Sequence, residues 1–342
     1  MLTLTVQHFG MTLNRKEIKA YTLENQAGIK VKILNYGGII SELHVPNKDQ
    51  QNVDVVLGFD SFLPYLNKHP YFGAIIGRYA NRIAEASFKI DKRTYRLTKN
   101  FGKHQLHGGV DGFDKKIWYA ETFQSEQQVS LKLSYLSKHG EEGFPGNLAV
   151  TVMYSLNKNN ELKISYQALT DKDTPVNLTN HSYFNLAGKG TILNQDIQIF
   201  SEAVLQTDQD LIPTGSILSV NNTHLDLRTP KNMGQLLQNQ SFDHAYILSN
   251  SFKNMVLVAK AVCPENGIKM EVLSNKPSIQ FYTPNFEQKI MGKNDQFYEG
   301  RAAFCLETQH YPDAPNHPSF PSALVTHEQN YEYATIYKFG IA

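Results

Sequence analysis

Alternating apolar and polar residues are the dominant pattern along this chain of 342 residues, and they predict β-strands. The alternation is cleanest in three consecutive runs, which are Val129–Tyr135, Leu148–Tyr154 and Leu162–Ala168. Residues typical of turns separate the runs at 139–146 and 157–160. These runs predict an antiparallel meander in which every second side chain faces the core.

Shorter segments of the same kind occur along the rest of the chain. Strands are expected at 29–34 and 39–45 around a Gly37-Gly38 corner, and a hairpin at 88–97 around Asp91-Lys92-Arg93. Further apolar segments predict strands at 53–59, 74–77, 118–122, 197–200, 255–262, 268–273, 279–283, 302–306 and 334–339.

Helical patterns are almost absent from the sequence. Residues 233–238 have a brief helical pattern, and 61–67 could form one turn capped by Asp60 or Ser61. Parallel α/β folds need amphipathic helices of 10–15 residues between their strands, and none is present. No repeat, linker or shift in composition marks a boundary. We therefore predict one all-β domain over residues 1–342, a large antiparallel β-sandwich with very little helix.

Composition and charge narrow the possible partners. The 18 Tyr and 19 Phe favour strands, and 33 Lys and Arg against 32 Asp and Glu leave a net charge of +1. Neither nucleic acid nor an anionic membrane surface is therefore expected as a partner. No signal peptide or membrane span is evident. Cys263 and Cys305 are expected to be reduced and buried, which favours a cytoplasmic protein.

The segment 177–188, Asn-Leu-Thr-Asn-His-Ser-Tyr-Phe-Asn-Leu-Ala-Gly, follows neither a strand nor a helix period. Its adjacent polar side chains need hydrogen-bond partners, because an unpaired buried polar group costs about 1–3 kcal/mol. A polyhydroxylated ligand or a dense internal network would provide such partners. We take this segment as the centre of the protein.

Other ionisable or polar residues interrupt apolar strands in the same way. They are Asn81, Arg82, His107, Asp243, Gln280 and Glu307. Each one alone is more often a structural or solvated residue than a functional one. His104 and His107 lack a third metal ligand at a recognisable spacing, and Gly102, Gly108 and Gly109 do not form a phosphate loop. We therefore expect neither a metal site nor a phosphate loop.

What remains is one histidine, one glutamate and several neutral donors with an arginine, a set suited to moving protons on hydroxyl groups. A buried Glu can accept a hydroxyl proton, and an imidazolium can donate one to another oxygen. Tyr183, Phe184 and Phe281 are candidates to cover the face of a sugar ring.

Sequence blocks along essentially the whole chain resemble those of the aldose 1-epimerase (galactose mutarotase) family. The blocks are PYFGAIIGRYANRI (70–83), LHGGVDGFDKKIW (106–118), EEGFPG (141–146), TPVNLTNHSYFNLAG (174–188), LIPTG (211–215), FDHAY (242–246), IQFYTPNF (279–286) and FCLETQHYPDAPNHPSFP (304–321). So many blocks in one order make the resemblance specific.

The resemblance implies a β-supersandwich that interconverts the α and β anomers of free hexoses such as galactose and glucose, without a cofactor. It points to Glu307 as the base on the C1 hydroxyl and to His181 as the acid on the ring oxygen. It also implies sugar contacts from Asn81, Arg82, His107, Asp243 and Gln280. Tyr183 is expected to join them because of its aromatic ring. The expected partner is a neutral monosaccharide, and the protein is expected to be a monomer or a weak homodimer.

The sequence departs from the family pattern at Tyr79, Pro284 and His310-Tyr311, which could alter the pocket rim. Two alternatives stay open, a mutarotase for hexose 6-phosphates and a non-catalytic sugar-binding protein on the same fold. A phosphate site would need several cations, and only Arg78 and Arg82 lie near a matching block. We expect the imidazole of His181 and the carboxylate of Glu307 on opposite sides of a pocket about one pyranose wide.

Overall fold

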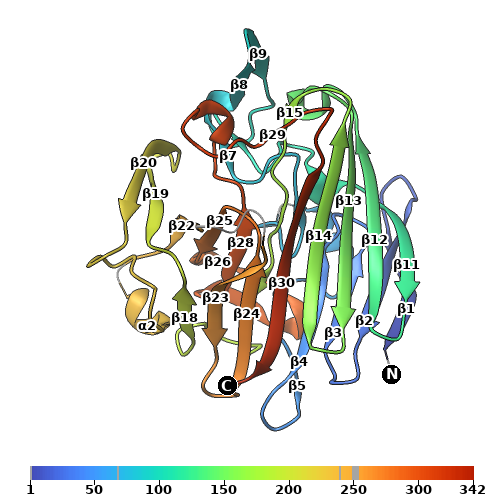
Figure 1. Cartoon of the computed structure of the whole chain (residues 1–342). Helices are drawn as coiled ribbons and strands as arrows, with labels where there is room; N and C mark the ends of the chain where they lie inside the picture. The colour runs from blue at the N-terminus through green and yellow to red at the C-terminus, as the bar shows by residue number, and fades with distance from the viewer. Residues whose placement is uncertain (1, 68, 239, 249–253) are drawn as a thin grey trace.

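Antiparallel sheets dominate the computed structural model, which describes residues 2–67, 69–238, 240–248 and 254–342 (Figure 1). About 50% of the structure is strand and 7% is helix. This confirms the predicted all-β class with very little helix. None of the helices in the described part of the chain has the length and apolar composition needed to cross a bilayer.

The broadest sheet has nine strands and contains the predicted meander (Figure 1). Its strands, in spatial order, are β11 (Tyr119–Gln124), β12 (Gln128–Ser137), β13 (Leu148–Asn157), β14 (Glu161–Thr170), β30 (Tyr331–Ile341), β24 (Ile268–Ser274), β23 (Val256–Val262), β18 (Asp196–Ile199) and β21 (Lys231–Asn232). Val152 of β13 pairs with Leu133 of β12 and Tyr166 of β14, so the alternating apolar residues share one face. The meander prediction is confirmed.

Two further sheets make up the opposite layer. The five-stranded sheet consists of β1 (Thr3–Met11), β2 (Glu17–Glu24), β3 (Lys30–Leu34), β4 (Ile40–Pro46) and β5 (Asn52–Asp54). The six-stranded sheet consists, in spatial order, of β17 (Tyr183–Phe184), β28 (Phe304–Gln309), β25 (Ser278–Tyr282), β22 (Asp243–Ile247), β19 (Ala203–Thr207) and β20 (Pro213–Ser219).

The chain just after β5 connects these two sheets. Val56 bridges Phe184, and the amide of Leu57 donates to the carbonyl of Tyr183 at 2.9 Å. The main hydrophobic core contains residues of all three sheets, such as Val31, Val152 and Phe281. The five- and six-stranded sheets therefore act as one layer that packs on the nine-stranded sheet, as expected for a β-sandwich.

Short strand pairs and helical turns complete the structure. The paired strands are β6 (Ile75–Ile76) with β16 (Thr179–Asn180), β7 (Arg82–Ile83) with β10 (Gln105–Leu106), β8 (Ser87–Ile90) with β9 (Arg93–Arg96), β15 (Thr174–Pro175) with β29 (Leu324–Val325), and β26 (Phe286–Met291) with β27 (Phe297–Gly300). The helical turns are α1 (Leu63–Leu66), α2 (Met233–Leu236), η1 (Ala84–Ala86), η2 (Phe113–Lys115), η3 (Glu141–Gly143), η4 (Lys293–Asp295) and η5 (Ala314–Asn316).

The corner between β3 and β4 shows why the sequence needs glycine there. Gly37 and Gly38 have φ angles of 63° and 57°, in the left-handed region that side chains disfavour. A Cβ on Gly37 would also lie 2.2 Å from the carbonyl oxygen of Asp114. The predicted pair of strands around a glycine corner is therefore confirmed.

Some local predictions were wrong. The N-cap of α1 is Phe62 without a side-chain hydrogen bond, instead of Asp60 or Ser61. The strand expected at 302–306 is β28, which extends to Gln309. The polar residues at its end stay in the strand because β28 pairs with β25 over this stretch, with Gln280 opposite Glu307 and Ser278 opposite Gln309.

Candidate active site

The two faces of the six-stranded sheet differ in chemistry. In β28, Leu306 points into the main core, whereas Cys305 and Glu307 point to the other face. Residues directly opposite on neighbouring strands share a face, so Tyr282 lies beside Cys305 and Gln280 beside Glu307. Strand register thus gathers the polar residues of three strands on one side of the sheet.

His181 reaches this polar face from the short connection between β16 and β17. Its backbone is fixed at both ends, because its amide donates to the carbonyl of Ala74 at 2.9 Å and its carbonyl accepts from Gly73 at 3.0 Å. The imidazole ring stacks on Tyr183, with centroids 5.0 Å apart and planes 12° apart. The imidazole ring also stacks on Tyr71, with centroids 5.9 Å apart and planes 21° apart. These contacts restrict rotation of the ring.

The structure brings His181 and Glu307 together. Nε2 of His181 lies 3.7 Å from Oε1 of Glu307, and the two side chains are 5% and 3% exposed. Oε2 of Glu307 is buried and has no hydrogen-bond partner among the described residues. The two groups are side by side rather than on opposite sides of a pyranose-sized gap, so that expectation was wrong.

Burial changes the acid strength of both groups in opposite directions. It raises the pKa of Glu307 well above its ordinary value; the charge of Asp243 raises it further, and that of Arg82 opposes this. Burial lowers the pKa of His181 to about 3, opposed by a hydrogen bond to its own backbone. An ionised Glu307 is therefore a stronger base than a free carboxylate, and a protonated His181 is a stronger acid than a free imidazolium.

A polar network continues from Glu307 across the sheet. Nε2 of Gln280 donates to Oδ1 of Asp243 at 2.5 Å, and Nη2 of Arg82 donates to Oδ2 at 3.3 Å. Gln309 orients the Gln280 amide by donating to its Oε1 at 3.1 Å. The Asp243 side chain is 23% exposed, against 9% for Arg82, so solvent reaches the network at Asp243.

Asn81 and His107 come from two loops that hydrogen-bond to each other. The amide of Asn81 donates to Nδ1 of His107 at 3.1 Å, and the amide of His107 donates to the carbonyl of Asn81 at 3.1 Å. Because Nδ1 accepts a hydrogen bond, Nε2 carries the proton of the neutral ring. The His107 ring lies 5.2 Å from that of His181. Both residues have positive φ angles, 66° and 53°.

Most of the other polar side chains in 177–185 bond to the protein itself. Nδ2 of Asn180 donates to Gly73, Oγ1 of Thr179 donates to Thr308, and Nδ2 of Asn177 donates to Ala80. Oγ of Ser182 donates to Oδ1 of Asn180 at 2.6 Å. The segment is thus a dense internal network, from which the His181 side chain projects toward Glu307.

Three aromatic residues were predicted to cover the face of a sugar ring, and the prediction was wrong for two of them. Phe184 and Phe281 lie in the main core with at most 1% exposure, whereas Tyr183 lies on the polar face. Tyr71 and Tyr282 are the aromatic neighbours of His181 that the prediction missed. Both stand in blocks that carry the family resemblance, and alternation places Tyr282 on the face opposite to Phe281.

The positions that depart from the family pattern are buried. The hydroxyl of Tyr79 donates to the carbonyl of Tyr311 at 2.9 Å, and the amide of His310 donates to Oδ1 of Asn177 at 2.8 Å. Pro284 is also buried. Tyr79 and His310 are thus held inside the protein rather than displayed at an open rim. The two cysteines are unpaired and buried, as predicted.

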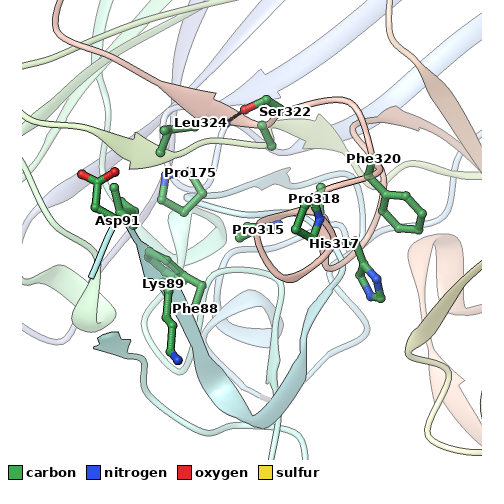
Figure 2. A pocket seen from close by; sticks show the side chains of 13 residues that line it. Phe88, Lys89, Asp91, Pro175, Pro315, His317, Pro318, Phe320, Ser322 and Leu324 are labelled. Carbon is green, nitrogen blue, oxygen red and sulfur yellow. Dashed lines mark hydrogen bonds between the residues drawn. The ribbon is translucent and has the colours of Figure 1, made fainter. Parts of the chain in front are cut away.

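A cavity of about 260 Å³ lies elsewhere, beside the β8–β9 hairpin and η5 (Figure 2). Figure 2 shows His317 next to Phe320, and Ser322 bonded to the backbone of Leu324. None of the predicted site residues lines this cavity, so it is separate from the cluster around His181. Within the described ranges, no group of three His, Cys, Asp or Glu side chains is arranged to hold a metal ion.

Comparisons with known proteins show which sequences and structures this chain resembles. The sequence profile of the aldose 1-epimerase family matches residues 19–338. A galactose mutarotase from Bos taurus is 41% identical over the whole of both chains. An aldose 1-epimerase from Escherichia coli K12 is 34% identical over 93% of this chain and 94% of its own. A solved aldose epimerase homologue from C. elegans superimposes with a TM-score of 0.86 at 25% identity, covering all of both chains.

Proposed function

This chain belongs to the aldose 1-epimerase family, and we propose that it interconverts the α and β anomers of free hexoses such as galactose and glucose. In this proposal Glu307 is the base for the C1 hydroxyl and His181 is the acid for the ring oxygen. The observation that carries the assignment is the 3.7 Å approach of Nε2 of His181 to Oε1 of Glu307 in a buried site.

The short separation suits the reaction, because the two oxygens that exchange protons are bonded to the same carbon, C1. Glu307 removes the proton of the C1 hydroxyl while His181 protonates the ring oxygen. The bond between C1 and the ring oxygen breaks, and C1 becomes a carbonyl carbon. After rotation about the C1–C2 bond, the ring closes on the other face and both protons return. Ring opening and closure need no catalytic help beyond these proton transfers, so the proposal includes no cofactor.

The electrostatics of the site favour both proton transfers. Before ring opening, the pair is an ionised Glu307 beside a protonated His181; after ring opening, both are neutral. Because burial raises the pKa of Glu307 and lowers that of His181, the low-polarity surroundings favour the neutral pair. Glu307 and His181 share one proton, so their titration is a property of the pair and not of either residue alone.

The remaining site residues are proposed to hold the sugar hydroxyls. A free hexose carries no charge, so its recognition must use hydrogen bonds to hydroxyl groups. Nε2–H of His107 supplies one donor. Nε of Arg82 is a buried donor without a partner among the described residues. Asp243 and Gln280 offer further groups at the more exposed end of the network. Asn81 orients His107 through its backbone, and Tyr183 supports the ring of His181.

Polarimetry tests the proposal directly. Freshly dissolved α-galactose should reach its equilibrium rotation faster with this protein than in buffer. A rate equal to that of buffer would leave the non-catalytic sugar-binding alternative in its place. Glucose should be measured in parallel to establish which hexose is preferred.

The hexose 6-phosphate alternative has little support from the arginines. Nη1 of Arg78 donates to the carbonyls of Pro145 and Gly146, and Nη2 donates to the carbonyl of Ser137. Arg82 is paired with Asp243. Strong inhibition of galactose turnover by low concentrations of glucose 6-phosphate would favour this alternative.

We extend the proposal to the organisation of the protein. One core cluster contains residues from Leu2 to Phe339, which supports a single domain over 1–342. The two buried thiols suit a reducing cytoplasm, and the net charge of +1 suits a neutral sugar instead of nucleic acid. A single cooperative unfolding transition and an elution volume of a monomer or weak dimer are the expected results.

A further inference from the structure

The two ring nitrogens of His181 face two side chains of the same strand. Nε2 lies 3.7 Å from Oε1 of Glu307, and Nδ1 lies 3.6 Å from Sγ of Cys305. Cys305 and Glu307 are two positions apart in β28 and therefore point to the same face. The imidazole bridges them, and stacking on Tyr183 and Tyr71 holds its plane in place.

The proposed reaction places a requirement on Nδ1. If Nε2 gives its proton to the sugar and later takes it back, the other ring proton must stay on Nδ1 throughout. The second nitrogen of a functional histidine is usually held by a carboxylate or a backbone carbonyl. Here the side chain within hydrogen-bond distance of Nδ1 is a thiol, whose sulfur is a weak acceptor.

We propose that Cys305 is a positioning residue whose sulfur accepts the Nδ1–H of His181 and so keeps Nε2 as the nitrogen that exchanges a proton with the sugar. This inference rests on the proposed role of His181 as the acid. A strong acceptor at Nδ1 would stabilise the imidazolium and make it a poorer acid. A weak acceptor fixes the tautomer without that loss.

The surroundings keep the thiol neutral. Burial, followed by the charges of Glu307 and Asp243, raises the pKa of Cys305 well above its ordinary value. A thiolate, which would hold the imidazolium strongly, is therefore disfavoured. The ring of His181 also has a hydrogen bond to its own backbone. The other groups that face or influence it are Tyr71, Tyr183, Tyr282, His107 and, through its charge, His69.

Nitrogen NMR of the ¹⁵N-histidine-labelled full-length protein tests the tautomer. In the sugar-free wild type at neutral pH, the His181 ring should show a protonated Nδ1 and an unprotonated Nε2. The His181→Gln variant identifies its signals. Cys305→Ala should shift the balance toward the other tautomer, because Nδ1–H loses its side-chain acceptor. A protonated Nε2 in the wild type, or an unchanged pattern in Cys305→Ala, would overturn the proposal.

Kinetics separates positioning from packing. Cys305→Ala should lower kcat about 10- to 100-fold with KM within about twofold, as for loss of a residue that orients a functional histidine. Cys305→Ser retains an acceptor, so it should recover most of kcat. Because the serine oxygen is a stronger acceptor than the cysteine sulfur, this variant should also move the acid limb of the pH profile to higher pH. Equal losses in Ala and Ser variants that fold normally would contradict the proposal.

Cys263→Ser is the matched control, because Cys263 is equally buried but belongs to the main core. It should leave the His181 signals and the pH profile unchanged. The two proposals fail in different ways: absence of mutarotation in the wild type removes the proposed function, whereas the NMR experiment reports the bond between Cys305 and His181 regardless of turnover.

Discussion

The two faces of the six-stranded sheet share one backbone but serve different purposes. On one face, Phe281, Phe304 and Leu306 are at most 1% exposed and join the main apolar core. On the other face, Gln280 and Glu307 lie beside Asp243 and His181. Alternation along single strands therefore lets one sheet stabilise the fold and position a polar site. Neighbouring residues of one strand should consequently affect different properties when they are changed.

The largest expected effects separate Glu307 from its neighbour Leu306. Glu307→Gln keeps the shape of the side chain but removes the base, so turnover of galactose should fall by about 10²–10⁴-fold with little change in stability. Leu306→Ala should reduce the free energy of unfolding by about 2–5 kcal/mol and leave turnover per folded molecule nearly unchanged. Polarimetry and urea denaturation measure the two quantities. Similar changes in both variants would contradict the division between the faces.

The next effect concerns the charge at the exposed end of the polar face. Asp243→Asn should lower kcat/KM by about 10- to 100-fold, because hydrogen bonds to a charged group contribute about 1.5–3 kcal/mol. The charge of Asp243 raises the pKa of Glu307, so the variant should lower that pKa. The pair would then lose its shared proton at lower pH, and the alkaline limb of kcat/KM should move to lower pH. A move to higher pH would exclude this coupling.

A third expectation concerns acid stability. Burial, with a contribution from the charge of Lys276, lowers the pKa of His310 to about 3, against 6.5 for an ordinary histidine. Between these values the unfolded chain binds the extra proton, so the stabilisation is complete above about pH 6.5 and is lost as the pH falls toward 3. The loss is about 1.4 kcal/mol per pH unit for one such histidine.

His310→Gln is the variant that tests this expectation. It removes one titrating group, so the free energy of unfolding should fall less steeply between pH 6.5 and 4 than in the wild type. Denaturant titrations at several pH values measure the slope. Exposed His8, paired with Glu17, supplies the control, and His8→Gln should leave the slope near that of the wild type. Parallel curves for His310→Gln and the wild type would contradict the expectation.

The smallest effect is expected at Tyr71, the aromatic neighbour that sequence reasoning missed. Tyr71→Leu should reduce kcat/KM about 2- to 10-fold, because an aromatic contact is worth about 0.5–1.5 kcal/mol. Tyr71→Phe keeps the stacked ring and should behave like the wild type. Equal losses in both variants would shift the role from the ring to the hydroxyl group.

Much of the fold was predictable because strand alternation is a local signal. The meander of β12, β13 and β14 followed directly from apolar residues at every second position. The boundaries of β28 were harder to predict. Its last residues, Glu307 to Gln309, are polar, and they remain in the strand because the ladder with β25 continues beside them.

The candidate site was predicted from motifs whose roles came from the family resemblance. His181 and Glu307 are adjacent in space, as their proposed action on one sugar carbon requires, yet no local pattern relates positions so distant in sequence. Phe184 and Phe281 were predicted at the site because they are aromatic, but both lie in the main core. Alternation alone cannot state which face of a strand meets the core.

The sequence by itself determined the strands, the turns that need glycine and the residue types able to move protons, because backbone conformation and side-chain chemistry are local properties. Only the tertiary structure decided which of these side chains meet. The register of β25, β28 and β17, and the backbone bonds that fix His181 between Gly73 and Ala74, are set by contacts between distant segments. Those contacts place Cys305 and Glu307 on either side of one imidazole.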